Sequence, residues 1–463
     1  MNVMNVDVAI VGTGTAGMGA YRAAAAHTDS IVLIEGSYYG TTCARVGCMP
    51  SKLLIAAAEA AHQAGHTAPF GVHVSGVEVN GVEVMDRVRR ERDRFVGFVL
   101  ESVEGFKEEH KLKGYARFVD SHTLMVDEHT RVKAKSIVLA VGSTPDIPKL
   151  FDGLDDRVVI NDDVFYWQDL PKSLAVFGPG VIGLELGQAL HRLGVRTTIF
   201  GRGGRVGPFT DPEIKEYSKK ILSEELDLQY CAQVKNLSKE QDGVRIDFLD
   251  NQGNQRSESY QYCLVTTGRR PNFDKLCLEN AALDLTDSGV PKYDTRTMQC
   301  GQTHIFIAGD ANNHYQLLHE ASDEGRIAGA NAALFPKVSK GHRRSPLNIV
   351  FCDPQMTVIG SSHADLVEQE VDFVIGKVSF ENQGRSRVML VNKGLMHVYA
   401  EAKTGRFLGS EIFGPRAENL GHLLCWSHQQ KMTIAQMLDM TFYHPVIEEG
   451  LRTALRDANA KLK

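Results

Sequence analysis

The chain has 463 residues, a length that predicts about three domains. Its residues are 43% hydrophobic and 23% charged with a net charge of −6, which is typical of a soluble globular protein and indicates neither a nucleic-acid-binding nor a membrane-surface protein. No apolar run reaches the about 18 residues of a membrane span, and no basic segment precedes an apolar one at the start, so we expect neither a transmembrane helix nor a signal peptide. Eight cysteines are too few for a disulfide scaffold, and we expect most of them to be reduced, as in a cytoplasmic protein.

The first predicted element is a short buried strand at 7–11. The glycine-rich turn Gly12-Thr13-Gly14-Thr15-Ala16-Gly17 follows, then an alanine-rich helix to about His27 and a second strand at 30–34 that ends at Glu35. This order predicts a dinucleotide-binding unit, whose turn we call the first fingerprint. Its glycines allow a tight turn and let a pyrophosphate approach the helix N-terminus, and Glu35 stands where an acid binds a ribose 2′-hydroxyl.

Two cysteines, Cys43 and Cys48, come next, just before a long apolar helical pattern. Residues five apart in a regular helix are separated by about 7.5 Å along the axis, whereas a disulfide needs Cα atoms about 5.5–6 Å apart. A disulfide here therefore requires a distorted backbone, which Gly47 makes easier. A strained pair of this kind is typical of redox chemistry, although the spacing alone is equally compatible with two buried structural thiols.

A second fingerprint, Gly178-Pro179-Gly180-Val181-Ile182-Gly183, follows a predicted strand at 174–177 and precedes a helix at 184–193 and a strand at 195–200. Two such units in one chain predict two bound dinucleotides. The sequence therefore favours electron transfer between two cofactors over a dehydrogenase with a single cofactor.

The two units differ at the end of their second strand. Glu35 lies 18 residues after Gly17. The residue 18 after Gly183 is Gly201, not an acid, and Arg202 and Arg205 follow it. A missing acid with an arginine nearby favours a coenzyme with a 2′-phosphate, NADP(H), over NAD(H). The alternative is that Arg202 is a solvated loop charge.

Three more apolar strands end at residues that suit a ligand: Gly142, Gly268 and Asp310. An aspartate at such a strand end can accept hydrogen bonds from ligand hydroxyls and can also cap the following helix. The pattern changes at about Asn348, where strand-like segments precede a helix-rich tail from Ala417. We expect a separate α+β domain there.

Six motifs in this order carry a family resemblance: residues 12–17 with Glu35, 43–48 with Pro50 and Lys52, 178–183 with Glu185, 268–272, 308–310 and 444–449. Over nearly its whole length the chain resembles the pyridine nucleotide-disulfide oxidoreductases of the type that contains dihydrolipoyl dehydrogenase, glutathione reductase and mercuric reductase. The resemblance implies an α/β fold with two Rossmann-like dinucleotide-binding domains, for FAD and NAD(P), and a C-terminal α+β dimerisation domain. It divides the chain into 1–150 (FAD, first part), 151–270 (NAD(P)), 271–345 (FAD and central, second part) and 346–463 (dimerisation).

The resemblance also assigns roles to single residues. It implies that Cys48 is the charge-transfer thiol beside the flavin and Cys43 the interchange thiol that meets the substrate. His444 would be the base, oriented by Glu449 and supplied by the other subunit of a homodimer, because thiol–disulfide exchange needs a thiolate and histidine has a suitable pKa. The remaining implied site residues are Lys52 and Glu185 beside the flavin's reactive nitrogen; Gly12, Gly14, Gly17, Glu35, Thr42, Gly142 and Asp310 for FAD; and Gly178, Gly180, Gly183, Arg202 and Gly268 for NAD(P). No metal is implied.

The departures from the family pattern narrow the substrate. Val181 is a small aliphatic residue, as is usual in dihydrolipoyl dehydrogenases, where glutathione reductases carry a tyrosine. No cysteine pair closes the C-terminus, which speaks against mercuric reductase. We therefore predict a dihydrolipoyl dehydrogenase-like enzyme that passes electrons between dihydrolipoamide and NAD(P) through Cys43, Cys48 and FAD. The alternatives are an NADPH-dependent reductase of another small disulfide and a slow flavoprotein redox sensor. The expected partners are a small disulfide or dithiol and a second copy of the chain; nucleic acid and membrane are not expected, and membership of a 2-oxoacid dehydrogenase complex stays open.

Overall fold

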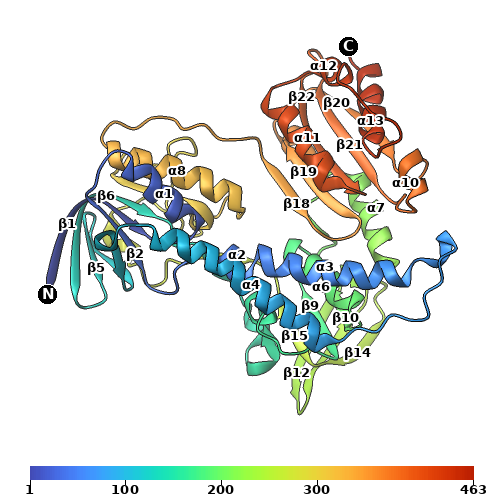
Figure 1. The fold of residues 1–463 in the computed structure, drawn as a ribbon, viewed down its shortest axis with the longest axis horizontal. Helices are drawn as coiled ribbons and strands as arrows, with labels where there is room; N and C mark the ends of the chain where they lie inside the picture. Colours follow the sequence, from blue (N-terminus) through green and yellow to red (C-terminus); the bar gives the residue numbers. More distant parts are fainter. The chain divides into compact units, whose positions relative to one another are not determined.

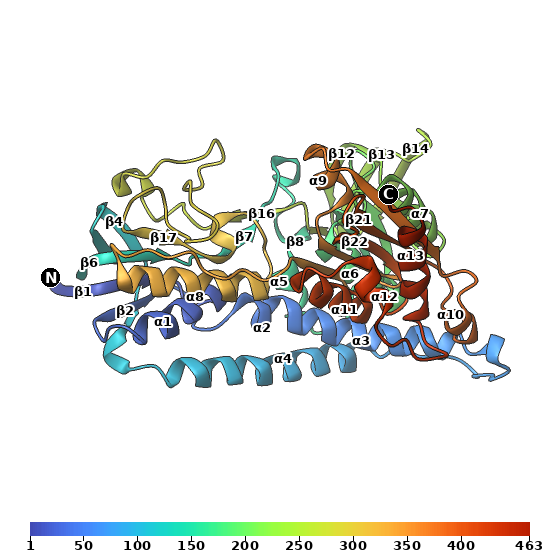
Figure 2. The ribbon, with the colours of Figure 1, turned by 90° about the horizontal axis from the view of Figure 1, so that it is seen from above.

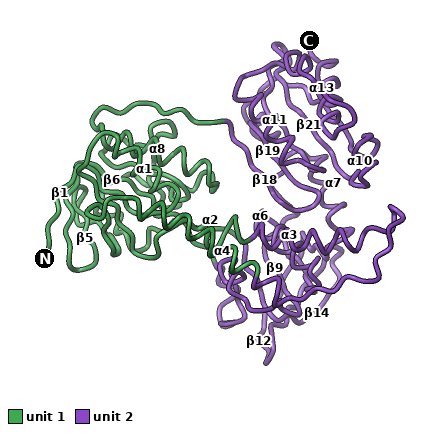
Figure 3. Tube along the Cα trace, viewed as in Figure 1, with its two compact units in different colours: residues 1–50, 87–146, 268–344 green, residues 51–86, 147–267, 345–463 purple.

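The computed structural model describes residues 1–463 and groups them into two compact units, each built from three segments of the chain. Unit 1 holds residues 1–50, 87–146 and 268–344, and unit 2 holds residues 51–86, 147–267 and 345–463 (Figure 3). Two long helices, α3 (Cys48–Gly65) and α4 (Gly81–Glu104), have residues in both units. No helix is long and apolar enough to cross a membrane.

Unit 1 is built on a seven-stranded sheet, which is parallel around β1 (Figure 1). In spatial order the strands are β3 (Lys111–Lys113), β2 (Ile31–Glu35), β1 (Asn2–Val11), β6 (Thr130–Leu139), β5 (Thr123–Val126) and β4 (Ala116–Asp120), with β17 (Ile305–Ile307) paired to β6. The strand predicted at 7–11 is longer, because β6 pairs with it from Asn2 onward. Its first residues alternate between exposed and half-buried, so no buried apolar run marks them in the sequence.

Helices α1 (Thr15–Ala25) and α8 (Leu318–Leu334) run together along one face of this sheet (Figures 1 and 2). Small residues let the two backbones meet: a Cβ on Gly325 would lie 2.1 Å from the carbonyl oxygen of Ala16, and one on Gly329 would lie 2.1 Å from that of Ala20. The apolar strand predicted to end at Asp310 is strand only from Ile305 to Ile307. Gly309, with φ +73°, then turns the chain into the short helix η6 (Gly309–Asn312). A two-stranded sheet of β7 (Ser143–Pro145) and β16 (Arg269–Pro271) completes the unit.

Unit 2 contains the second dinucleotide-binding sheet, with its strands in parallel. The order is β11 (Asp227–Gln229), β10 (Arg196–Phe200), β9 (Ser173–Phe177), β15 (Tyr262–Val265) and β8 (Val158–Val159). Helices α6 (Val181–Arg192) and α7 (Pro212–Ser223) follow β9 and β10, and α5 (Asn161–Val164) follows β8. The antiparallel strands β12 (Gln233–Glu240), β13 (Gly243–Leu249) and β14 (Gln255–Tyr260) form a separate three-stranded sheet that the sequence did not predict.

The rest of unit 2 is the expected C-terminal α+β domain. Its antiparallel sheet has the order β18 (Leu347–Val350), β19 (Gln355–Gly360), β22 (Phe407–Gly414), β21 (Leu395–Glu401) and β20 (Phe373–Ser379). The helices of this domain are α9 (His363–Glu368), α10 (Gly384–Val388), α11 (Ala417–Gln429), α12 (Ile434–Leu438) and α13 (Glu449–Ala460). The predicted fold class is confirmed: two Rossmann-like sheets and a separate C-terminal α+β domain. The four predicted domain ranges stay predictions.

Candidate active site and dinucleotide sites

The first fingerprint connects β1 to α1 in a conformation that only glycine suits. Gly12 has φ +105°, and a Cβ there would lie 2.3 Å from the carbonyl oxygen of Ala140. Gly14 is the N-cap of α1 and supplies no side-chain cap, and a Cβ on it would point into open space. The first N–H groups of α1 are therefore accessible to a pyrophosphate, so this turn fits the FAD that the motif predicts.

Glu35 is already held in place at the end of β2. Its Oε2 accepts hydrogen bonds from the backbone N–H of Thr13 at 2.9 Å and from the Thr13 hydroxyl at 2.6 Å, and its Oε1 accepts one from Ser37 N at 2.7 Å. Thr13 is fully buried. The residue between the first two glycines of the fingerprint thus orients the predicted ribose acceptor, a contact that the motif spacing does not reveal.

Asp310 stands at the start of η6, after β17. Its Oδ2 accepts a hydrogen bond from the Ser143 hydroxyl at 2.8 Å, and Ser143 Oγ in turn accepts one from Arg269 Nε at 2.9 Å. Gly142, predicted to bind cofactor, comes directly before Ser143 and has φ +68°. Unit 1 therefore brings Asp310 and Gly142 together through Ser143, and Gly268 precedes Arg269 in the same unit.

The cysteine motif begins in α2 (Thr42–Val46), whose N-cap is Thr41. The helix stops at Gly47, where φ is −133° and ψ is −117°, and α3 starts again at Cys48. A Cβ on Gly47 would lie 3.1 Å from the carbonyl oxygen of Thr42 and 3.2 Å from the Cα of Cys43, so the break folds back onto the first cysteine. Cys43 is half-buried and Cys48 is exposed. The regular helical separation that would keep two such sulfurs apart is thus absent.

Lys52 and Glu185 meet in unit 2. Lys52, one turn after Cys48 on α3, places its Nζ 2.7 Å from Glu185 Oε2 on α6. Glu185 is buried, and its other oxygen accepts a hydrogen bond from Phe351 N at 3.0 Å. The Lys52 ammonium also lies 4.4 Å from the centroid of the Phe351 ring. The sequence suggested the pair but not Phe351, which holds both partners from a distant segment.

His444 and Glu449 form a second pair in unit 2. The two side chains approach to 3.0 Å, between His444 Nδ1 and Glu449 Oε2, and Arg452 Nη2 donates to Glu449 Oε1 at 2.9 Å. The hydrogen bond with His444 lowers the pKa of Glu449, so the carboxylate stays ionised at neutral pH. The His444 side chain is 80% exposed. This leaves its other ring nitrogen accessible to a group outside the unit.

The second fingerprint repeats the backbone of the first. Gly178 has φ +110°, and a Cβ there would lie 2.5 Å from the carbonyl oxygen of Thr266. Gly180, the N-cap of α6, again supplies no side-chain cap and borders open space. A Cβ on Gly183 would lie 1.9 Å from the carbonyl oxygen of Gly178, so the third glycine allows the helix and strand to meet. The turn therefore fits a dinucleotide pyrophosphate, and the exposed Arg202 follows the end of β10.

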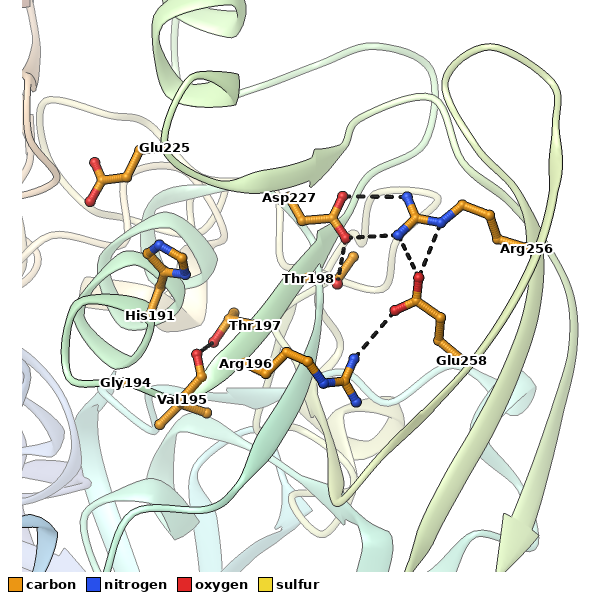
Figure 4. A pocket seen from close by; sticks show the side chains of 10 residues that line it. All are labelled: His191, Gly194, Val195, Arg196, Thr197, Thr198, Glu225, Asp227, Arg256 and Glu258. Atoms are coloured by element: carbon orange, nitrogen blue, oxygen red, sulfur yellow. Dashed lines mark hydrogen bonds and ion pairs between the residues drawn. The ribbon is translucent and has the colours of Figure 1, made fainter.

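A cavity of about 610 Å³ opens at the other end of this sheet (Figure 4). It is lined by the first residues of β10 and not by the fingerprint, which adjoins the last ones. Its arginines are already neutralised: Arg256 pairs with Asp227 and Glu258, and Arg196 also pairs with Glu258. We therefore do not assign the coenzyme to this cavity. No cluster of three or more His, Cys, Asp or Glu side chains suits a metal ion.

The sequence pattern of the pyridine nucleotide-disulphide oxidoreductases matches residues 6–325, and that of the dimerisation domain of these enzymes matches residues 347–455. The chain belongs to this family. Members use FAD and NAD(P)H, in agreement with the two fingerprints. The chain is similar to the dihydrolipoyl dehydrogenase of Bacillus subtilis, with 28% identity over 453 residues that cover 96% of this chain and 95% of the relative. It is equally similar to that of Chlamydia trachomatis, with 28% identity over 459 residues covering 96% and 94%.

Solved structures show the same fold at lower identity. The HOCl-induced flavoprotein disulfide reductase RclA from Escherichia coli superposes with a TM-score of 0.80 at 21% identity, covering 99% of this chain and all of the other. LpdA from Mycobacterium tuberculosis superposes with a TM-score of 0.82, also at 21% identity, covering 98% and 99%. Within the family, the chain is an FAD-dependent disulfide oxidoreductase.

Proposed function

We propose that the protein has dihydrolipoyl dehydrogenase activity and passes electrons between dihydrolipoamide and NAD(P) through Cys43 and Cys48. The observation that carries this proposal is the helix break at Gly47, which separates the two cysteines and folds back onto the first. The whole-length similarity to dihydrolipoyl dehydrogenases and the small Val181 in the second fingerprint support lipoamide as the substrate.

The proposed reaction is a thiol–disulfide exchange between the substrate and the cysteine pair. Dihydrolipoamide loses two protons and two electrons as its S–S bond forms, and the Cys43–Cys48 disulfide is reduced to two thiols. Cys43 is the sulfur that exchanges with the substrate, and Cys48 is the sulfur on the flavin side. Bound FAD supplies the two-electron carrier between the dithiol and NAD(P)+.

His444 is proposed as the base of this exchange. Only a thiolate attacks a disulfide, so the proton of the substrate thiol must be taken up and later returned. Glu449, held ionised by its hydrogen bond to His444, orients the imidazole and stabilises its protonated form. In the proposed homodimer, His444 of one subunit serves the cysteines of the other, which agrees with its exposure and with the dimerisation-domain match.

Lys52 and Glu185 are proposed to act beside the flavin as a fixed ion pair. Glu185 is buried and accepts from both Lys52 Nζ and Phe351 N, so the position of the ammonium is set before any ligand binds. The predicted FAD-binding and NAD(P)-binding residues keep the roles given to them above. A cytoplasmic location and membership of a 2-oxoacid dehydrogenase complex stay predictions.

One observation favours a second candidate, an NADPH-dependent reductase of another small disulfide. The strand end that carries an acid in the first unit carries Gly201 and Arg202 in the second, an arrangement that suits the 2′-phosphate of NADPH.

The test is a steady-state comparison of the purified holoenzyme with both coenzymes. The proposal predicts turnover of dihydrolipoamide with NAD+ or NADP+, and no turnover with either would contradict it. Faster NADPH oxidation with glutathione disulfide or another non-lipoyl disulfide would decide for the second candidate.

A further inference from the structure

The residue between the first two glycines differs between the fingerprints, and in both units it reaches the end of the second strand. In the first unit, Thr13 donates two hydrogen bonds to Glu35. In the second unit, the same place holds Pro179, which is buried and has no N–H to donate. The proline ring lies beside Gly201: a Cβ on Gly201 would be 2.7 Å from Pro179 Cγ and 3.1 Å from its Cδ.

Backbone hydrogen bonds show that Glu35 and Gly201 occupy equivalent positions beside the two fingerprints. Gly12 N donates to the carbonyl oxygen of Ile34 at 2.8 Å, and Gly178 N donates to that of Phe200 at 2.8 Å. Glu35 and Gly201 are the residues that follow these two carbonyls. The comparison of the strand ends therefore rests on equivalent hydrogen bonds as well as on residue counts.

Position 201 suits glycine because a side chain would lack room there, and not because its backbone conformation requires glycine. Its φ lies outside the left-handed range that disfavours other residues. The obstacles are the Pro179 ring and the Cα of Tyr230, which a Cβ would approach to 3.1 Å. The ring cannot swing away as a flexible side chain would, and Gly207 N holds the Pro179 carbonyl at 2.8 Å.

Cations surround the loop that begins at Gly201. Arg202 is exposed, and the loop folds back so that Gly204 N donates to the carbonyl oxygen of Tyr230 at 3.1 Å. Lys219 on α7 reaches the same loop: its Nζ lies 3.7 Å from the point where a Cβ on Gly204 would stand. The Lys219 side chain is only 12% exposed and pairs with the largely exposed Glu216 at 2.6 Å, so it meets a phosphate only by turning away from Glu216. The region thus offers the exposed cations Arg202 and Arg205, the paired cation Lys219 and, at the strand end, no carboxylate.

We propose that Pro179 and Gly201 form one determinant of coenzyme selectivity, and that Lys219 joins Arg202 in binding the 2′-phosphate of NADP(H). The proline ring fills the space of the acid that would accept from the 2′-hydroxyl of NAD(H), and it removes the N–H and hydroxyl that hold such an acid in the first unit. This inference rests on the proposed function only in that the second fingerprint binds the nicotinamide coenzyme.

The test measures binding of coenzyme fragments to the oxidised holoenzyme by calorimetry, which needs no disulfide substrate. The fragments are 2′,5′-ADP, which carries the 2′-phosphate, and 5′-AMP, which carries the free hydroxyl. The wild type is expected to bind 2′,5′-ADP at least about tenfold more tightly, the effect of one charge-assisted hydrogen bond. Gly201→Glu alone should weaken both fragments because the side chain meets the ring. Pro179→Thr/Gly201→Glu, which copies the Thr13–Glu35 arrangement, should reverse the preference in favour of 5′-AMP.

Two further variants isolate Lys219. Lys219→Ala should weaken 2′,5′-ADP by about tenfold and leave 5′-AMP unchanged. Lys220→Ala removes the same charge from the next, exposed position of α7 and should change neither affinity. An equal effect of both lysine variants would contradict the role of Lys219.

The proposal is overturned if the wild type binds both fragments equally, if Gly201→Glu alone reverses the preference, or if the double variant keeps the wild-type preference. Should the double variant not fold, Gly201→Ala is compared with Pro179→Thr/Gly201→Ala by thermal melting. The space argument predicts that the threonine restores stability lost to the alanine, and no restoration contradicts it. Failure of lipoamide turnover with intact fragment selectivity would count against the proposed function and not against this inference.

Discussion

The two fingerprints share a backbone and differ in how their side chains prepare it for a ligand. In the first unit, Thr13 and Ser37 hold Glu35, and Ser143 holds Asp310, so polar acceptors are fixed around the turn. In the second unit, the corresponding strand end has no side chain, and the nearby cation Arg202 is exposed. The first arrangement suits a cofactor that stays bound, and the second suits a coenzyme that binds and leaves. The glycine turn defines a dinucleotide site, whereas the residues around it decide which dinucleotide and for how long.

The largest effects, on FAD binding and on flavin reduction, should come from replacing the first glycine of each turn by alanine. Gly12→Ala and Gly178→Ala each force a Cβ into a backbone carbonyl at a left-handed φ. Gly12→Ala should abolish FAD binding and all activity. Gly178→Ala should keep its FAD but slow flavin reduction by NAD(P)H by about 100-fold or more, because the coenzyme is misplaced. The ratio of flavin to protein absorbance measures the loss of FAD, and anaerobic rapid mixing measures the rate of flavin reduction. Loss of FAD in both variants would contradict the different roles of the two turns.

The next largest effect on activity concerns the cysteines that we propose link the flavin to the substrate. Cys43→Ser and Cys48→Ser should each lower disulfide turnover by at least about 10³-fold, since no disulfide can then form. Both variants should still accept electrons from NAD(P)H, which shows that the coenzyme side works alone. Only Cys48→Ser should remove the long-wavelength thiolate–flavin absorbance. Identical spectra for the two variants would overturn the assignment of the two sulfurs.

Thr13→Val tests whether the first site depends on a held acid. The change keeps the size of the side chain and the N–H donor but removes the hydroxyl that donates to Glu35. FAD dissociation should become about tenfold faster, the effect of one hydrogen bond to a charged group. Flavin fluorescence measures the release, and Thr13→Ser should restore the wild-type rate. No change in Thr13→Val would mean that Glu35 needs no help from this residue.

Arg202→Ala tests whether the second site depends on a cation, where the first depends on an acid. It should weaken NADP(H) by about tenfold and leave NAD(H) nearly unchanged, because only the 2′-phosphate gains from the charge. Michaelis constants for the two coenzymes provide the measurement. An equal effect on both would make Arg202 a solvated loop residue.

The smallest expected effect is a pH dependence of the stability of unit 2. Asp211 caps α7 and contacts His397 Nδ1 at 2.8 Å. Burial raises the pKa of Asp211, but the hydrogen bond and charge of His397 outweigh it and lower the pKa to about 2. Because the folded pKa lies below that of the unfolded chain, this stabilisation is present above about pH 4 and is lost as the pH falls toward 2.

Both tryptophans, Trp167 and Trp426, lie in unit 2, so their fluorescence follows its unfolding. Flavin fluorescence should follow unit 1, where we propose that FAD binds. Asp211→Asn should flatten the acid side of the tryptophan melting curve and leave FAD release unaffected. A wild-type acid slope in this variant would assign the dependence to other groups.

The sequence predicted what depends on local spacing and missed what depends on distant segments. Glycine spacing located both turns, and counting from them located Glu35 and Gly201. Gly47 indicated the helix break. The contact of Phe351 with Lys52 joins residues about 300 positions apart, and no sequence motif predicts it.

The same reason explains why the sequence did not predict the roles of Thr13 and Pro179. Each fills a variable position of its fingerprint, and its partner becomes visible only when the strand end is brought back to the turn. The three-stranded sheet β12–β14 was missed because β12 and β14 are mostly exposed and show no buried apolar run.

We propose that one chain holds two redox centres in series, a flavin and the Cys43–Cys48 pair. Anaerobic titration of the oxidised holoenzyme with dithionite, followed by flavin absorbance, tests it most directly. The wild type should take up about four electrons, two for each centre, and Cys43→Ser about two. A wild type that takes up only two electrons, the same number as Cys43→Ser, would contradict the presence of a second redox centre.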